Sequence, residues 1–268
     1  MEWCSCVVEC TQVVLEMSLK NNKSLGQHWL KYRFILDENA DESILEDVRT
    51  CLEIGPGLGT LTSSRLRRFE KVIAVEFDER LAKNLPNSFP GKNLEVINTD
   101  FLKFDLDGIA ESYVVAGNIP YYITSPIIEK LVTAKNKPKR IALLIQKEVA
   151  ERILAGAGKH TYLSLSVQNF AEVESGILVE KDYFTPPPKV DSATIILIPR
   201  ETPLFSEEVL KFAKRGFLNP RKKLIKNLPF EKEKIEKAFE ELGLNENIRA
   251  QDLSHEDWAK LFAKVLQK

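Results

Sequence analysis

Short runs of apolar residues alternate, over the first two thirds of the chain, with segments that are apolar on one helical face only. Five runs are almost free of polar interruptions, as is typical of parallel strands buried on both faces of a sheet. Helix-like segments such as TLTSSRLRRF and SPIIEKLVTA lie between them. The alternation predicts an α/β protein with a doubly wound sheet. The five runs are TCLEIG (50–55), KVIAVEF (71–77), LEVINTD (94–100), YVVAGNI (113–119) and RIALLIQ (140–146).

Two later apolar runs, EVESGILVE (172–180) and ATIILIP (193–199), are separated by a loop rather than by a helix. Strands joined in this way are expected to run antiparallel. The predicted core is therefore a seven-stranded, mostly parallel sheet with an antiparallel last strand. A short linker between Pro199 and Pro203 follows, and the pattern beyond it is helical to the end. This indicates a small helical domain over residues 201–268.

Length and composition fit one large core with a smaller second domain. The 268 residues are 44% hydrophobic and 29% charged. No apolar run approaches the roughly 18 residues of a membrane span, and the opening MEWCSCVVEC lacks the basic start of a secretory signal. We therefore expect a cytoplasmic protein with no membrane contact. Residues 1–19 are expected to be a leader that is disordered or not translated, with Met17 as the alternative start.

Cysteine is concentrated at the start of the chain. Cys4, Cys6 and Cys10 lie within the first ten residues, and Cys51 lies inside a predicted strand. This is not the spacing of a disulfide framework. A zinc site would lack a nearby fourth ligand, because the nearest histidine is His28. We expect no metal.

The formal net charge of -1 gives no overall attraction to nucleic acid, but basic residues are concentrated locally. The segment KFAKRGFLNPRKKLIK (211–226) carries lysines and arginines with no acidic residue among them. A run of this kind is most often a solvated helix face. Because it alternates with apolar residues such as Phe212 and Leu224, it also indicates a packed pair of helices with one basic face.

Polar residues follow the first three predicted strands at the edge where their carboxyl ends would meet. Gly55, Gly57 and Gly59 would let the backbone turn tightly and approach a ligand. The third glycine comes two residues after the second, not three as in a dinucleotide fingerprint. Glu76 would bind both hydroxyls of a ribose, and Asp100 closes the third strand. This crevice suits S-adenosylmethionine, although glycines for packing and acids for helix caps remain the alternative interpretation.

The run GNIPYYITSPI (117–127) ends the fourth predicted strand with the tetrad Asn118, Ile119, Pro120 and Tyr121. The exocyclic amine of adenine is a poor nucleophile because its lone pair is delocalised into the ring. The Asn118 side-chain oxygen and a main-chain carbonyl such as that of Ile119 would accept its hydrogens and aim the lone pair at a methyl donor. Pro120 would stiffen the turn, and Tyr121 would stack on an extruded base. A strand-end turn with a buried tyrosine is the alternative.

These stretches, together with others, resemble the ribosomal RNA adenine dimethyltransferase family from about residue 20 to residue 249. The resemblance implies a Rossmann-like class I methyltransferase fold over residues 20–200 and an RNA- or ribosome-docking role for residues 201–268. The motifs that carry it are KSLGQHWL (23–30), LEIGPGLGTLT (52–62), VIAVEFD (72–78), GNIPYYITSPI (117–127), QKEVAERILAGAGKHTYLSLSVQ (146–168), FTPPPKVDSA (184–193) and RGFLNPRKKLIKNL (215–228).

The resemblance also implies roles for individual residues. Asn118 would stand at the methyl-transfer centre, and Phe184 would sandwich the target base against Tyr121. The chain has His28 and Trp29 where the family often has asparagine and phenylalanine. Because imidazole can replace the amide as a donor or acceptor, we expect altered cofactor affinity rather than lost binding. Leu163 stands where the family often has glycine, a difference that concerns the local backbone conformation and not the chemistry. The implied cofactor contacts are His28, Leu30, Gly55, Glu76, Asp100 and Asn118, and the candidate RNA contacts are Arg221, Lys222 and Lys223.

The activity that the resemblance implies is dimethylation of the exocyclic amine of two adjacent adenosines near the 3′ end of small-subunit ribosomal RNA. The cofactor would be S-adenosyl-L-methionine, and the enzyme would act as a monomer on a pre-ribosomal particle. A large-subunit adenine methyltransferase of the macrolide-resistance type shares the cofactor turn and the tetrad, but the basic NPRKKLIKNL favours the small-subunit enzyme. A non-catalytic ribosome assembly factor is the third alternative, against which the complete set of site residues argues.

Overall fold

The computed structural model of the chain describes residues 27–110 and 112–266. The predicted leader of residues 1–19 lies outside this described part. The chain forms two compact units, one comprising the residues up to Ala150 together with Glu172–Pro199 and the other Glu151–Ala171 together with the residues from Arg200 onward. The sequence suggested a single division after residue 200, whereas residues 151–171 group with the C-terminal helices.

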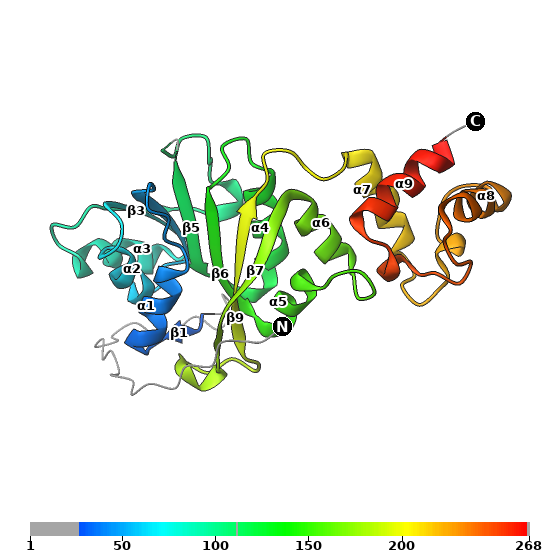
Figure 1. Cartoon of the computed structure of the whole chain (residues 1–268). Coiled ribbons are helices and arrows are strands. Elements are labelled where there is room, and N and C mark those ends of the chain that lie inside the picture. Colours follow the sequence, from blue (N-terminus) through cyan, green and yellow to red (C-terminus); the bar gives the residue numbers. More distant parts are fainter. Residues whose placement is uncertain (1–26, 111, 267–268) are drawn as a thin grey trace. The chain divides into compact units, whose positions relative to one another are not determined.

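A seven-stranded sheet forms the core of the first unit (Figure 1). The strand order is β4-β3-β2-β5-β6-β9-β7. Pairing is parallel from β4 to β6 and antiparallel between β6 and β9. The predicted mostly parallel sheet with an antiparallel last strand is confirmed. The strands are β2 (Thr50–Ile54), β3 (Lys71–Glu76), β4 (Leu94–Asn98), β5 (Tyr113–Asn118), β6 (Arg140–Gln146), β7 (Ala171–Val179) and β9 (Ser192–Pro199).

The central strands are buried on both faces, which explains their nearly continuous apolar sequence. Parallel register pairs Ile54 of β2 with Val75 of β3 and with Gly117 of β5. The strands therefore end at one common edge, and the residues that follow these pairs, Glu76 and Asn118, lie along it. This register places the predicted site residues together.

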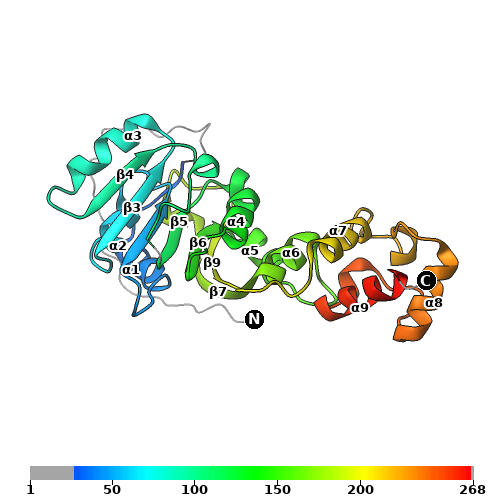
Figure 2. The same cartoon turned by 90° about the horizontal axis from the view of Figure 1, so that it is seen from above.

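Helices pack against both faces of the sheet, and Figures 1 and 2 place α1 and α4 on opposite sides. An additional short pair of strands, β1 (Trp29–Leu30) and β8 (Phe184–Thr185), was not predicted. It joins the motifs LGQHWL and FTPPPKV, which are far apart in the sequence. The helices of this unit are α1 (Arg33–Asp41), α2 (Thr60–Arg65), α3 (Glu79–Asn84) and α4 (Thr124–Thr133), and α5 (Lys147–Leu154) begins where the unit ends.

A buried ion pair anchors α2 to the sheet. Arg65 of α2 donates hydrogen bonds to Glu53 of β2 and to Asn39 of α1, both at 3.2 Å. Asn39 in turn donates to Thr194 of β9 at 3.0 Å. All four side chains are buried, so removing one partner would leave an uncompensated buried polar or charged group. The network fixes α2, which begins directly after the glycine turn.

The second unit is helical, as predicted. Its core surrounds Trp258, which packs with Phe212, Leu224 and Leu261. A Cβ at Gly216 would lie 2.4 Å from the Trp258 ring, so this close packing requires glycine. No helix of residues 27–110 or 112–266 is long and apolar enough to cross a membrane. The helices are α6 (Tyr162–Phe170), α7 (Glu207–Gly216), α8 (Lys232–Leu242) and α9 (His255–Leu266).

Candidate active site

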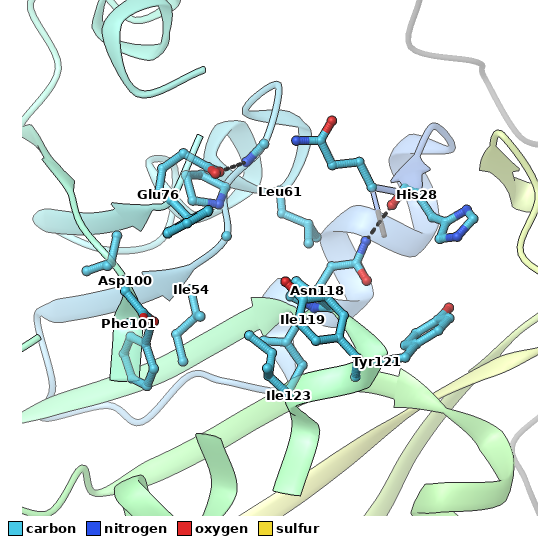
Figure 3. A pocket seen from close by; sticks show the side chains of 18 of the residues that line it. His28, Ile54, Leu61, Glu76, Asp100, Phe101, Asn118, Ile119, Tyr121 and Ile123 are labelled. Atoms are coloured by element: carbon cyan, nitrogen blue, oxygen red, sulfur yellow. Dashed lines mark hydrogen bonds between the residues drawn. The ribbon is translucent and has the colours of Figure 1, made fainter. Parts of the chain in front are cut away.

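A cavity of about 220 Å³ opens at the carboxyl edge of the sheet, between the glycine turn and the tetrad (Figure 3). Glu76 and Asp100 lie at one end of it, and His28 and Tyr121 lie at the other. Asn118 lies between the two ends. The predicted site residues that line this cavity are His28, Gly55, Glu76, Asp100, Asn118, Ile119, Pro120 and Tyr121.

The glycine turn between β2 and α2 uses backbone conformations that favour glycine. Gly57 and Gly59 have φ of 60° and 84°, in the left-handed region. A Cβ at Gly57 would lie 3.1 Å from the indole nitrogen of Trp29, and one at Gly59 would lie 2.7 Å from Leu85. Backbone conformation and space therefore both require the Gly-Pro-Gly-Leu-Gly spacing seen in the sequence.

Glu76 is held rigidly at the end of β3. Its Oε2 accepts a hydrogen bond from the Gly57 N–H at 3.0 Å, and its Oε1 accepts one from the Asp78 N–H at 2.8 Å. The side chain is 6% exposed. Burial raises the pKa of Glu76, and the hydrogen bonds from Asp78 and Gly57 oppose that rise. Because each carboxylate oxygen has a second lone pair, Glu76 can still accept hydroxyl hydrogens from a ligand.

Asp100 lies on a loop that is fixed from outside the cavity. Its carboxylate accepts from the Leu102 N–H at 2.9 Å and caps a 3-10 turn. Lys130 of α4 donates to the carbonyls of Leu102 at 2.9 Å and Phe104 at 2.5 Å. The Lys130 ammonium also lies 5.7 Å from the centroid of the Phe101 ring, within cation–π range. One lysine thus holds the loop by three contacts.

Asn118 ends β5 with a defined amide orientation. Its Nδ2 donates to the main-chain carbonyl of His28 at 2.9 Å (Figure 3). A carbonyl oxygen can only accept, so the amide nitrogen faces His28 and the acceptor Oδ1 lies on the other side of the group. Gly117 precedes it because a Cβ there would lie 2.7 Å from the Ile54 carbonyl oxygen. The tetrad therefore offers an oriented acceptor at the middle of the cavity.

Tyr121 is anchored through its hydroxyl. The hydroxyl lies 2.8 Å from the Oγ of Ser192, which is fully buried. Burial raises the pKa of the Tyr121 phenol, so the phenol stays neutral near pH 7. The ring stacks with His28, with centroids 6.1 Å apart and planes 16° from parallel. The His28 Nδ1 lies 2.8 Å from the Pro186 carbonyl oxygen.

The family model "Ribosomal RNA adenine dimethylase" matches residues 18–267. This chain belongs to the ribosomal RNA adenine dimethylase family. The chain is 39% identical over 253 residues to the ribosomal RNA small subunit methyltransferase A of Mycoplasmopsis pulmonis (strain UAB CTIP), a match that covers 92% of this chain and 100% of the relative. It is 36% identical to the protein of that name from Staphylococcus haemolyticus (strain JCSC1435), a match that covers 90% of this chain and 88% of the relative.

Two solved structures are similar to this adenine dimethylase over most of its length. A dimethyladenosine transferase from Plasmodium falciparum has a TM-score of 0.76 at 30% identity, covering 88% of this chain and 96% of that one. The 23S rRNA methyltransferase ErmE has a TM-score of 0.72 at 28% identity, and the match covers 89% of this chain and 100% of that one. The Rossmann-like methyltransferase fold implied by the sequence is therefore confirmed.

Two predicted site residues, Leu30 and Phe184, do not line the cavity. Leu30 and Phe184 are opposite each other in the β1–β8 pair, each is 1% exposed, and both pack in a core cluster with Leu36 and Leu61. Among the described residues, those that line the cavity do not include either of them. In this structure the Phe184 ring lies in that core cluster, and its implied sandwich of the target base against Tyr121 stays a prediction.

Several residues lining the adenine dimethylase cavity were not predicted from the sequence. Phe77, Leu102 and Tyr122 line it while 62%, 37% and 65% exposed, respectively. Only their positions in the sequence could have indicated them, because Phe77 directly follows Glu76 and Tyr122 directly follows the tetrad. Within the described ranges, no group of three or more His, Cys, Asp or Glu residues is placed to hold a metal ion.

The predicted RNA contacts of the adenine dimethylase belong to the second unit. Arg221, Lys222 and Lys223 are all exposed, and Lys223 lies 3.8 Å from Glu246. The expectation of a helix pair across residues 211–226 was wrong in part. Helix α7 ends at Gly216, and the three basic residues lie in a turn before a 3-10 helix that starts at Leu224.

Proposed function

We propose that this protein uses S-adenosylmethionine to dimethylate the exocyclic amine of two adjacent adenosines near the 3′ end of small-subunit ribosomal RNA. The observation that carries the proposal is the oriented amide of Asn118, whose nitrogen is held by the His28 carbonyl. Its acceptor oxygen is thereby available to an amine in the cavity. Membership of the adenine dimethylase family supports adenine as the base.

The residues present fit the cofactor. Gly55 has a φ of 65°, a left-handed conformation that favours glycine, and it lines the cavity between the turn and the tetrad. At the far end, Glu76 offers a buried carboxylate that two backbone N–H groups already orient for ribose hydroxyls. Bound S-adenosylmethionine supplies an electrophilic methyl group on a sulfonium. Glu76 would hold the ribose, with Asp100 and Phe77 beside the adenine moiety.

The chain's own residues prepare the target amine. Asn118 Oδ1 and the Ile119 carbonyl accept its two hydrogens, which fixes the direction of its lone pair. Transfer would form the nitrogen–carbon bond as the bond between the methyl group and the sulfonium breaks, with S-adenosylhomocysteine as the leaving group, and the amine would lose one proton to water. One N–H then remains for the second transfer, and either acceptor can hold it. Pro120 keeps the turn rigid, and the Tyr121 ring supplies a stacking face. This positioning lowers the barrier without a charged base at the amine.

The RNA partner is a small-subunit particle that the protein meets as a monomer in the cytoplasm. The net charge of -1 cannot attract RNA by itself, so binding relies on local basic residues such as Arg221, Lys222 and Lys223. Contacts to phosphates would dock the particle, while the splayed base enters the cavity. The relatives named small subunit methyltransferase A support this substrate over a large-subunit one.

Transfer of labelled methyl groups to purified subunits that lack the modification tests the proposal. We expect label in small-subunit RNA, recovered as dimethyladenosine by mass spectrometry of nucleosides, and none with Asn118→Ala. Label confined to large-subunit RNA would instead support the macrolide-resistance type of activity. Absence of label from both subunits, with intact particle binding, would identify a non-catalytic assembly factor.

A further inference from the structure

A single turn of the second unit carries the three basic residues that are proposed to contact RNA. This basic turn, residues 217–223, connects α7 to the 3-10 helix that follows. Arg221, Lys222 and Lys223 are exposed in it. Within residues 27–110 and 112–266, only Lys223 of the three forms an ion pair, with Glu246 at 3.8 Å. Like charges on neighbouring residues repel one another, which favours an open turn unless other contacts close it.

The side chain of Asn227 closes the basic turn at its base. Its Nδ2 donates to the carbonyl of Gly216 at 2.7 Å and to the carbonyl of Asn219 at 3.1 Å. Its Oδ1 accepts from the Nδ2 of Asn219 at 3.1 Å. Because a carbonyl can only accept, the two carbonyls fix the orientation of the amide, and both of its hydrogens are used. One neutral side chain therefore makes three hydrogen bonds across the turn.

The Gly216 carbonyl has no backbone donor within its own helix. It belongs to the last turn of α7, and the residue four positions later, Pro220, has no N–H. Asn227 supplies the missing donor. The Asn219 carbonyl, which Asn227 also contacts, accepts from the Lys222 N–H at 2.9 Å. Asn227 thus links the end of the helix to the backbone that carries the basic side chains.

The two ends of the basic turn are anchored in the core of the second unit. Gly216 lies against the Trp258 ring, where a Cβ would be only 2.4 Å from it. Leu224 is buried in the same core, and its N–H donates to the Ile248 carbonyl at 2.8 Å. With both ends fixed, the hydrogen bonds of Asn227 hold the segment between them.

We propose that Asn227 is a positioning residue for RNA docking, which preforms the basic turn so that Arg221, Lys222 and Lys223 meet RNA phosphates together. This inference rests on the proposed function. A turn that is ordered before binding avoids the entropy loss of ordering it in the complex. Asn227 is uncharged, so it acts through the conformation of the turn and not through attraction to phosphate.

A double-variant cycle separates this role from general stability. Asn227→Ala is made in wild type and in a neutralised variant, Arg221→Gln/Lys222→Gln/Lys223→Gln. The Kd for small-subunit particles that lack the modification is measured at low salt, where RNA binding is tightest, and thermal melting is recorded for each protein. Ser254→Ala is the matched control, because it removes the hydroxyl that accepts from the Asp257 N–H at the start of α9 and leaves the basic turn untouched.

We expect Asn227→Ala to raise the particle Kd of wild type about 10-fold, as for a turn that is closed only about one tenth of the time. In the neutralised variant the same substitution should change the Kd by less than about twofold, because the cations through which Asn227 acts are absent. Asn219→Ala removes only the bond to the Asn227 Oδ1 and should have a smaller effect. Ser254→Ala should lower the melting temperature without changing the particle Kd.

Two results would overturn the proposal. Equal losses of affinity in the two backgrounds would show that Asn227 acts independently of the cations. An unchanged Kd for Asn227→Ala, with weak binding by the neutralised variant, would leave RNA docking by the basic residues in place and remove Asn227 from it.

If Asn227→Ala does not fold, Asn219→Ala in both backgrounds decides the same question, because it leaves the donor to Gly216 intact. Failure of the proposed function is distinct. Wild-type protein would then transfer no methyl group to small-subunit RNA, a measurement that does not involve position 227.

Discussion

The side-chain amide of Asn118 donates a 2.9 Å hydrogen bond to the main-chain carbonyl of His28, a residue 90 positions earlier in the chain. The partner is a backbone group, so substitution at position 28 leaves it in place. The Asn118 amide is therefore oriented by the fold before any ligand arrives. Preorganised polar groups of this kind lower a barrier without reorganisation during the reaction.

Asn118→Ala should reduce methyl transfer by about 100-fold or more while leaving the cofactor Kd within a few-fold. The magnitude follows the loss seen when one preorganised polar group at a reacting centre is removed, and the loss should appear in turnover. Asn118→Asp should be similarly inactive, because a carboxylate cannot donate to the His28 carbonyl. Single-turnover assays with calorimetry check this. Near-normal formation of dimethyladenosine would show that the catalytic centre lies elsewhere.

Glu76→Gln should weaken binding of S-adenosylmethionine by about 10-fold or more. Both carboxylate oxygens accept backbone N–H groups, so an amide NH2 would face one of these donors and could not accept from a ribose hydroxyl. Hydrogen bonds to a charged group contribute about 1.5–3 kcal/mol each. Calorimetry decides the matter, with Glu79→Gln on the exposed side of α3 as the matched control. Equal affinity in Glu76→Gln and wild type would remove this carboxylate from the site.

Lys130→Met should raise the Kd for the cofactor several-fold with little change in turnover at saturation. The ammonium holds the carbonyls of Leu102 and Phe104 and contacts the Phe101 ring. Without it the loop that carries Asp100 loses its outer support, while the tetrad is untouched. Calorimetry measures the Kd for the cofactor and saturation kinetics measures turnover, with the exposed Lys135→Met as the control. A fall in turnover with normal Kd would contradict a role in positioning this loop.

Ionisation of the buried Glu42 carboxyl should lower the free energy of unfolding of the first unit as the pH rises from 5 to 8. Burial raises its pKa from 4.5 to about 7. Because the folded state binds the proton more tightly, the stabilising contribution is complete below pH 4.5 and is lost as the pH rises through 7. The loss amounts to at most about 3 kcal/mol in the free energy of unfolding.

Urea unfolding of wild type and Glu42→Gln between pH 5 and pH 8 tests this dependence. Glutamine keeps an oxygen that can accept from the Ile177 N–H, as Glu42 Oε1 does at 2.6 Å. The variant should therefore lose the pH dependence and remain folded. Parallel pH profiles for the two proteins would assign the titration to another group.

Neutralising Arg221, Lys222 and Lys223 together should weaken particle binding and reduce its salt dependence. Each phosphate contact that is lost lowers the slope of log K against log salt by about 0.7–0.9. Turnover at saturating particle should change little, because the tetrad lies in the other unit. Binding assays at several salt concentrations measure the slope.

A matched control neutralises three lysines of the second unit that are already paired with glutamates at helical spacing, Lys211, Lys232 and Lys260. These should contribute less to the slope, since their charge is partly compensated. Wild-type affinity and slope in the Arg221/Lys222/Lys223 variant would identify that segment as ordinary solvated surface. Docking would then fall to other basic residues, such as Lys31 and Arg33.

The sheet and most of the residues that line the cavity could be predicted from local sequence patterns. Uninterrupted apolar runs predict strands buried on both faces, and parallel strands end at a common edge. Glu76, Asp100 and Asn118 follow such runs, so their meeting at one edge follows from local pattern and register alone. The positive φ of Gly55, Gly57 and Gly59 was likewise predictable from the residue type.

Contacts between distant parts of the chain set which side chains face the cavity. Phe184 packs in the core opposite Leu30, where β1 pairs with β8. His28 lies beside Tyr121, with its Nδ1 close to the Pro186 carbonyl oxygen. Both contacts with the segment around β8 join parts of the chain about 150 residues apart, which no local period encodes. Lys130 supports the Asp100 loop because α4 packs against the 3-10 turn that follows Asp100. The sequence does not show which groups a lysine will contact, because its hydrogen-bond partners depend on how the helices and loops pack in three dimensions.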